Sequence, residues 1–276
     1  MARGQRGRVL IGTSGYVYGD WRGRFYPQAL PARQWLSFYA ARFPTVELNN
    51  SFYRLPSAAM FRAWRKAVDA DYVFAVKASR FLTHLKRLKD ARGPLDVFLA
   101  RARHLGPTLG PVLFQLPRQF HANAGRLDDF LRVLDRQRRV ANLRAVLEVR
   151  HPSWLEPSIL ERLERAGVAL CIHDSKAQPV TGPITADFVY VRRHGYGRRG
   201  SYTRRALERD AAAIRRWRAQ GLDVYVYFNN DWRAFAIRNA LALAQLARGS
   251  AGRRSGLRTG AAYTAGVPKV PAPAAA

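Results

Sequence analysis

The sequence ADFVYVRRHG at residues 186–195 decides the fold class of the chain. Within it, Val189 and Val191 alternate with larger aromatic and polar residues, and a period of two is typical of a β-strand with two unlike faces. One face is aliphatic, whereas the other becomes polar toward its end, at Arg192 and His194. In a strand of an α/β barrel, the aliphatic face packs against helices and the other face points to the interior. The stretch therefore predicts one strand of a barrel with a polar mouth.

Seven further apolar runs of this kind lie along the chain. The eight predicted strands are Arg8–Thr13, Thr45–Asn49, Tyr72–Ala78, Pro111–Leu116, Arg144–Arg150, Val168–His173, Phe188–His194 and Asp223–Asn229. Helical spacing follows at Arg33–Phe43, Ser57–Val68, Pro94–Leu105, Leu127–Gln137, Ser158–Ala166, Thr203–Gln220 and Trp232–Leu246. Only the connection Asp174–Asp187 lacks a clear helix. Strands that alternate with helices form parallel sheets with right-handed crossovers, so eight repeats predict a single (β/α)8 TIM barrel.

The main alternative is a doubly wound open sheet. Such a sheet normally carries a glycine-rich phosphate turn after its first strand, and Gly12-Thr13-Ser14-Gly15 does not match that pattern. The length of 276 residues also fits one barrel. We expect a barrel domain over residues 8–247, a disordered N-terminus over residues 1–7, and a disordered basic tail rich in Ala, Gly and Pro over residues 248–276.

The net charge of +28 suggests anionic partners. The two terminal segments carry seven cations and no acid, which leaves +21 for residues 8–247. Only six of the 47 cations are lysine, however, and such an arginine bias can reflect a GC-rich genome as well as contact with phosphate. Nucleic acid is therefore one possible partner.

Targeting signals give little reason to place the chain outside the cytoplasm. The apolar run Val9–Ile11 is too short for a secretory signal, and no longer run could cross a bilayer, so we expect no membrane partner. The only cysteine, Cys171, lies in an apolar run and is interpreted as a small core residue. We expect a cytoplasmic protein.

The alternation of side chains predicts a polar ring where the strands run into the following loops. On the interior parity we place Thr45, Glu47, Asn49, Val146, Glu148, Arg150, Tyr190, Arg192, His194, Tyr225, Tyr227 and Asn229. Lys77, Gln115 and His173 end the third, fourth and sixth strands. Barrel enzymes place their chemistry at this C-terminal face. Buried charges are costly unless paired, so the ring either satisfies itself through salt bridges or holds a ligand. We favour a ligand because glycine-rich loops adjoin the ring.

Several motifs resemble those of one family. They are Gly12-Thr13-Ser14-Gly15, Trp21, Phe25-Tyr26-Pro27, Val46-Glu47-Leu48-Asn49, Phe52-Tyr53-Arg54, Pro56, Lys77, Arg80, Thr83-His84, Gln115-Leu116-Pro117, Glu148-Val149-Arg150-His151, Trp154, Tyr190-Val191-Arg192, His194-Gly195, Phe228-Asn229-Asn230 and Asn239-Ala240. In order and spacing they resemble the YecE-like family, a domain-of-unknown-function family, over about residues 8–247. The resemblance implies a TIM barrel and no established reaction. Arg118 stands where a second proline is expected, and Asn50-Ser51 where relatives often have Ser or Asp followed by Thr.

A phosphate site is predicted at the loops after the last two strands. Gly195 and Gly197 permit close approach of the backbone, and Asn230 or Asp231 would cap the helix near Trp232 and expose amide donors. Phosphate sites of barrels commonly lie at this corner. The alternative is a solvated basic loop.

A metal centre is a weaker interpretation. Glu47, Glu148, His173, Asp174 and His194 could converge as ligands, but no motif with metal-ligand spacing is present and arginines would adjoin the cation. We therefore predict no metal ligands, and the sequence identifies no cofactor.

The candidate catalytic residues are Glu148 and Lys77, which burial could tune for proton transfer, with Glu47, His173 and Asp174 next. The candidate binding residues are Arg150, His151, Arg192, His194, Asn229, Asn230, Gln115, Trp21 and Tyr53. No nucleophile elbow or P-loop is present. The leading hypothesis is an enzyme that binds a phosphorylated or otherwise anionic small molecule. The alternatives are a nucleic-acid-binding protein or phosphodiesterase, and a noncatalytic ligand-binding barrel.

Overall fold

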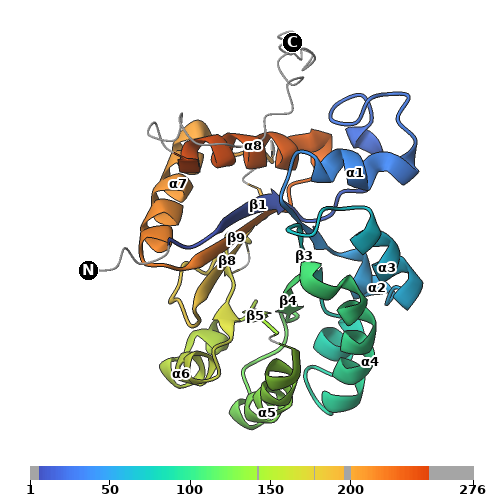
Figure 1. The fold of residues 1–276 in the computed structure, drawn as a ribbon. Coiled ribbons are helices and arrows are strands. Elements are labelled where there is room, and N and C mark those ends of the chain that lie inside the picture. Colours follow the sequence, from blue (N-terminus) through green and yellow to red (C-terminus); the bar gives the residue numbers. More distant parts are fainter. Residues whose placement is uncertain (1–5, 142, 177, 196–199, 249–276) are drawn as a thin grey trace.

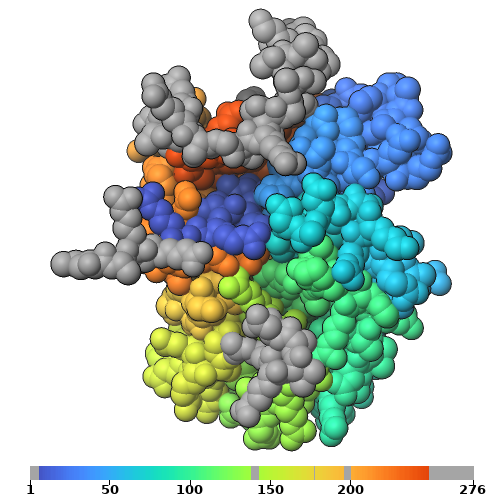
Figure 2. Space-filling model, in the orientation of Figure 1, coloured from blue at the N-terminus to red at the C-terminus, as the bar shows by residue number. Residues whose placement is uncertain are grey.

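A computed structural model describes residues 6–141, 143–176, 178–195 and 200–248 of the protein. Parallel strands form a central barrel, and the helices follow one another around it (Figure 1). Figure 2 shows the same order on the surface, where the colours pass around the molecule from blue through green to yellow and orange. The predicted TIM barrel is confirmed.

The barrel has eight strands, because β6 and β7 are two halves of one strand that is interrupted at Cys171. The strands are β1 (Val9–Thr13), β2 (Thr45–Leu48), β3 (Val73–Lys77), β4 (Leu109–Gln115), β5 (Ala145–Glu148), β6 (Ala169–Leu170), β7 (Ile172–His173), β8 (Phe188–Arg193) and β9 (Asp223–Phe228). They pair in the orders β2-β3-β4-β5-β6 and β1-β9-β8-β7. Between β1 and β2, the amide of Gly15 donates to the carbonyl oxygen of Glu47 at 2.7 Å and closes the ring.

The helices lie outside the strands. They are α1 (Trp35–Ala40), α2 (Asn50–Tyr53), α3 (Ala58–Lys66), α4 (Arg92–Ala102), α5 (Ala124–Ala141), α6 (Pro157–Arg165), α7 (Arg204–Ala219) and α8 (Phe235–Arg248). Short helical turns lie at Gly19–Trp21, Ala32–Gln34, Phe81–Leu85, Arg103–Thr108, Pro152–Leu155 and Trp232–Ala234. As predicted, the sixth connection holds no helix in its described residues, 174–176 and 178–187.

Two apolar layers follow from the alternation along each strand. Val189 and Val191 of β8 pack in the layer between strands and helices, with Val46 of β2. Tyr190, between the two valines, packs inside the barrel with interior residues that include Cys171. The predicted parity is therefore observed, and Cys171 is a fully buried interior residue.

The segments predicted to be disordered lie mostly outside the described residues. Of residues 1–7, the structure describes Arg6 and Gly7, and of residues 248–276 it describes Arg248, the last residue of α8. Gly7 is buried, and its carbonyl oxygen accepts a hydrogen bond from Nε of Arg218 at 3.2 Å. A Cβ at residue 7 would lie 1.9 Å from the carbonyl oxygen of Leu222. Gly7 thus packs directly on the turn after α7.

None of the helices in the described residues is both long and apolar enough to cross a membrane.

Candidate functional site

A cluster of buried charges lies inside the barrel near the C-terminal ends of its strands. Arg192 of β8 bridges Glu47 of β2 and Glu148 of β5, with Nη2 at 2.8 Å from Oε1 of Glu47 and Nη1 at 2.8 Å from Oε2 of Glu148. All three residues are at most 1% exposed. The bridge joins three strands and neutralises most of the charge that the barrel buries.

The remaining carboxylate oxygens are also occupied. The hydroxyl of Tyr190 donates to Oε2 of Glu47 at 2.6 Å, and Nε of Arg150 donates to Oε1 of Glu148 at 2.6 Å. Burial alone would raise the pKa of Glu148, but the two arginines outweigh it and hold that pKa well below its ordinary value. Glu148 is therefore an ionised anchor for Arg192 and Arg150, and its geometry does not favour the predicted role in proton transfer.

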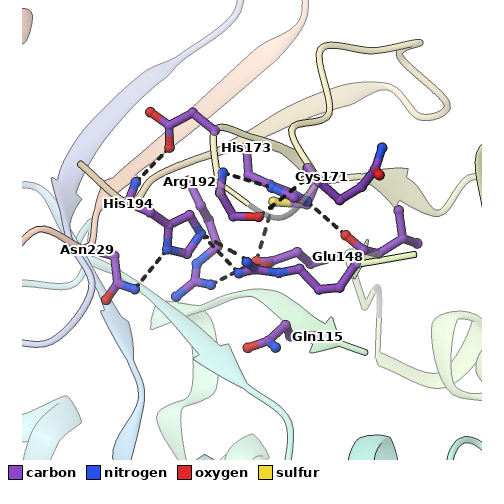
Figure 3. A network of polar contacts seen from close by, with 12 residues as sticks. Gln115, Glu148, Cys171, His173, Arg192, His194 and Asn229 are labelled. Atoms are coloured by element: carbon purple, nitrogen blue, oxygen red, sulfur yellow. Dashed lines mark hydrogen bonds and ion pairs between the residues drawn. The ribbon is translucent and has the colours of Figure 1, made fainter. Parts of the chain in front are cut away.

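Above this cluster a cavity of about 540 Å³ opens at the mouth of the barrel. It is lined by Tyr18, Asn49, Tyr53, Lys77, Gln115, Arg118, Arg150, Arg192, His194, Asn229 and Asp231. These residues end strands or begin the loops that follow them, as predicted for the C-terminal face. Figure 3 shows Glu148, Arg192, His194 and Asn229 converging in the polar network below it. Three other hollows lie on α5 and α6, beside α8, and between α4 and α5, and none of their charged lining residues is buried.

Lys77 occupies an unusual position in this cavity. It ends β3, is only 9% exposed, and holds its Nζ over the ring of Phe52 at 4.0 Å from the centroid. Within the described part of the chain, Nζ forms no ion pair with a carboxylate. Burial and the nearby charge of Arg192 lower the pKa of Lys77 from 10.5 to about 8, although Glu148 and Glu47 oppose the shift. The pKa of this amine therefore lies close to physiological pH.

His194 is neutral at physiological pH. Burial and the charge of Arg192 lower its pKa to about 3. Its Nε2 lies 3.2 Å from Nη2 of Arg150, and its Nδ1 lies 3.2 Å from Nδ2 of Asn229. Within the cavity it can offer hydrogen bonds but no positive charge to a ligand.

Two other candidate catalytic residues are engaged in local structure. Nε2 of His173 lies 2.9 Å from the carbonyl oxygen of Val149, and burial lowers the pKa of this histidine. Asp174 accepts hydrogen bonds from the amide of His194, at 2.8 Å, and from the hydroxyl of Tyr202. Neither residue lines the cavity. Both hold the backbone at the end of the strands.

The predicted phosphate loop is organised differently from the expectation. The amide of Gly195 donates to the hydroxyl of Tyr202 at 2.8 Å and is not free for a ligand. Gly197 lies outside the described residues. Asp231 stands at the N-cap of the turn before α8 without a side-chain cap hydrogen bond, and the amide of Arg233 donates instead to Oδ2 of Asp20 at 2.8 Å.

Three predicted binding residues lie away from the cavity. Trp21 is fully buried and donates from Nε1 to the carbonyl oxygen of Asp231 at 2.7 Å. The ring of His151 lies against that of His121 with centroids 3.8 Å apart, and its Nδ1 lies 2.9 Å from Oγ of Ser153. Nδ2 of Asn230 donates to Oδ1 of Asn239 at 2.9 Å. Their polar groups therefore fix loops around the mouth.

Four lining residues were not among the predicted site residues, namely Tyr18, Asn49, Arg118 and Asp231. Arg118 directly follows the Gln-Leu-Pro motif where we expected a proline, and that departure was the available signal. Asn49 had been placed on the interior parity, and its Oδ1 is buried with no hydrogen-bond partner among the described residues. Burial raises the pKa of Asp231.

In the described residues, no group of three or more His, Cys, Asp or Glu side chains is arranged to hold a metal ion. Among the five residues weighed as ligands, Glu47 and Glu148 face Arg192 instead of one another. The donor set at the mouth is dominated by cationic nitrogen, which does not suit a divalent cation.

The chain is similar to several proteins in both sequence and structure. It is 27% identical over 259 residues to the UPF0759 protein YunF of Bacillus subtilis (strain 168), and the alignment covers 81% of this chain and 89% of that protein. A crystal structure of the DUF72 family protein TM1631 from Thermotoga maritima MSB8 superimposes with a TM-score of 0.71 at 26% identity, covering 87% of this chain and 98% of that one. The DUF72 family protein EF0366 from Enterococcus faecalis V583 gives a TM-score of 0.70 at 20% identity and covers 88% and 98%.

A family model described as "Protein of unknown function DUF72" matches residues 10–260, which is most of the chain. The match confirms the resemblance to the YecE-like family that the motifs predicted. On the motifs, the barrel and these relatives together, the chain belongs to the DUF72 family.

Proposed function

We propose that the protein is an enzyme that binds an anionic small molecule in the cavity at the mouth of the barrel. The observation that carries the proposal is the charge of the lining. Four cations, Lys77, Arg118, Arg150 and Arg192, face the cavity with one lining acid, Asp231. Even when Glu47 and Glu148 beneath them are included, one positive charge remains uncompensated. An anionic ligand would complete the balance.

The uncompensated charge can be assigned to two side chains. Arg192 is held by both glutamates and Arg150 by Glu148. Lys77 and Arg118, in contrast, form no ion pair with another residue of the described chain. They are therefore the groups that would bind a phosphate or carboxylate.

The remaining lining fits a small polar ligand. Amide groups of Asn49, Gln115 and Asn229 can bind hydroxyl groups, and a volume of about 540 Å³ is that of a small-molecule site. Lys77 supplies the group that would act on the ligand, because an amine with a pKa of about 8 exchanges protons readily near neutral pH.

Thermal unfolding in phosphate and in chloride at equal ionic strength tests the anion site. Phosphate also stabilises proteins in general by exclusion from their surface, so a directed site is measured by the part of the phosphate excess over chloride that depends on the residues of the cavity. We expect Lys77→Met to abolish this part of the excess and Lys66→Met, at an exposed position of α3, to retain it. Equal stabilisation of the native chain by both salts would reject the proposal.

A specific observation supports nucleic acid as a second candidate ligand. Five exposed apolar side chains lie in the segments that follow β1, β2, β3 and β9, namely Val17, Tyr53, Phe81, Leu85 and Trp232. Arg233 lies over the ring of Trp232 at 4.7 Å. Exposed aromatics beside cations are the usual elements of a single-strand site. Binding of an oligo-dT that weakens steeply with salt and is lost in Tyr53→Ala and Trp232→Ala would favour this candidate.

A further inference from the structure

The amine of Lys77 has the environment of a nucleophile. Its Nζ lies over the ring face of Phe52, and the lysine is only 9% exposed where it reaches the cavity from the end of β3. Attack on a carbonyl carbon requires a neutral amine; the contact with the ring favours the ammonium form, but burial without a carboxylate partner among the described residues raises the neutral fraction. Lys77 meets this requirement, whereas a lysine paired with a carboxylate would not.

The two buried glutamates are prevented from capturing this amine. Glu47 is bound by Tyr190 and Arg192, and Glu148 by Arg150 and Arg192. With these carboxylate oxygens already bound by other donors, the charge network leaves Lys77 unpaired while it keeps positive charge close to it. Nearby positive charge also favours the neutral amine.

The backbone of Lys77 is fixed, so the amine is carried by a rigid element. The carbonyl oxygen of Lys77 accepts a hydrogen bond from Oγ of Ser51 at 2.7 Å, and Lys77 aligns with Leu113 of β4. On the other side, Asn49 follows Leu48, the partner of Val76. The amide oxygen of Asn49, which has no hydrogen-bond partner among the described residues, thus lies just past the end of the strand next to the lysine and can accept a hydrogen bond from a ligand hydroxyl.

Cations in the same lining supply a place for the charged end of a ligand. Arg118, the second unpaired cation of the lining, follows the end of β4, the strand that pairs with the strand carrying Lys77. A ligand with a carbonyl group at one end and a phosphate or carboxylate at the other would match an amine and a guanidinium group in one cavity. We infer that Lys77 condenses with the carbonyl group of a phosphorylated or carboxylated aldehyde or ketone to form an imine.

The step balances without an oxidant or a cofactor. The lone pair of neutral Nζ forms the C–N bond, and the carbonyl oxygen becomes the hydroxyl of a carbinolamine. One proton of Nζ has moved to this oxygen to form the hydroxyl, and one proton from solvent then converts the hydroxyl to water, which leaves as the C–O bond breaks. The product is the iminium ion of Lys77 and one water molecule. The inference rests on the proposed anion site and adds the reactive group of its ligand.

Reductive trapping with cyanoborohydride tests the inference. The native protein would be incubated with D-glyceraldehyde 3-phosphate, and D-glyceraldehyde would serve as the uncharged counterpart. Because the chain has only six lysines, peptide mass mapping can assign each adduct. We expect the phosphorylated aldehyde to label Lys77 at least tenfold faster than Lys66 or Lys86, and inorganic phosphate to suppress that labelling. Lys77→Arg should lose the adduct, and Lys66→Arg should keep it.

The competition by phosphate requires no variant, so it stands even if a substitution at Lys77 impairs folding. If Lys77 is labelled no faster than Lys66 and Lys86, and phosphate does not slow its labelling, the inference is overturned. An unlabelled Lys77 in a protein whose excess stabilisation by phosphate is still lost in Lys77→Met would also overturn it, while leaving the anion site intact. Absence of both effects would overturn the two proposals together.

Discussion

At the scale of single residues, the site depends on how Arg192 distributes its hydrogen bonds. One guanidinium group serves two carboxylates from different strands, at 2.8 Å each. The sequence predicted that Glu47, Glu148 and Arg192 share the interior, because alternation along a strand determines which face a side chain takes. It could not predict that Arg192 would satisfy both glutamates and leave Lys77 unpaired. That outcome depends on distances across the barrel.

We expect Arg192→Met to destabilise the protein by about 3–5 kcal/mol, because two buried carboxylates would lose their counter-charge. Equilibrium unfolding in urea measures the change. The matched control is Arg204→Met, which removes an ion pair with Glu208 on the surface of α7. A surface pair of this kind contributes about 0–1 kcal/mol. A loss below 1 kcal/mol for Arg192→Met would show that the bridge is not structural.

The lowered pKa of Lys77 predicts a pH dependence of stability. The unfolded lysine keeps its proton up to about pH 10.4, whereas the folded one loses it near 8, so the unfolded state binds more protons in between. Stability conferred by this group should therefore rise with pH from 8 to 10.5. The charges that face it are those of Arg192, Glu148, Glu47 and Arg150.

The free energy of unfolding, measured against pH for the native chain and for Lys77→Met, isolates this contribution because other titrations cancel. The variant should be the more stable of the two at pH 7, by roughly 3 kcal/mol at most. The difference should shrink as the pH rises toward 10.5. A difference that stays constant with pH would show that Lys77 has an ordinary pKa.

At the scale of elements, strands were easier to predict than loops. Val189 and Val191 determine the register of β8, because a shift by one residue would turn both side chains from the helix layer to the interior of the barrel. Trp21 and Asn230 were placed at the mouth because they follow strands. Their actual partners, the carbonyl oxygen of Asp231 and the amide of Asn239, lie 210 and 9 residues away in sequence. No local pattern indicates such contacts.

The loop after β8 depends on the backbone at Gly195. This residue has φ of +95°, and a Cβ would lie 2.8 Å from the carbonyl oxygen of Gly200. We expect Gly195→Ala to destabilise the protein by roughly 1–3 kcal/mol through backbone strain and this contact. Gly93→Ala, in α4 where a Cβ meets nothing within 4 Å, should leave stability unchanged or raised. Equal effects of the two substitutions would contradict the proposed strain.

At the scale of the whole molecule, eight βα repeats bring residues from most of the chain to one mouth. Tyr18 and Asp231 line the same cavity because β1 pairs with β9. The sequence predicted this closure from the number of repeats and the lack of a phosphate turn. The specificity of the cavity could not be predicted from the sequence, because Arg118 and Lys77 are the unpaired cations only once the fold has paired Arg150 and Arg192 with glutamates.

Truncation after Ala247 should leave the melting temperature nearly unchanged. Residues 248–276 contain no periodic apolar side chains that could pack on the barrel. Arg248 is the last residue of α8, so the cut removes no full turn of that helix. Thermal unfolding of the two proteins in the same buffer measures the effect. A fall of many degrees would mean that this segment packs against the domain.

The central claim is that the mouth of the barrel holds an anion through its unpaired cations, Lys77 and Arg118. A crystal structure of the protein soaked in phosphate and a divalent cation tests it most directly. We predict phosphate density in the cavity within hydrogen-bond distance of Nζ of Lys77, with the cation absent from it. A cavity that holds the divalent cation, or that stays free of phosphate when the anion binds elsewhere on the surface, would contradict the claim.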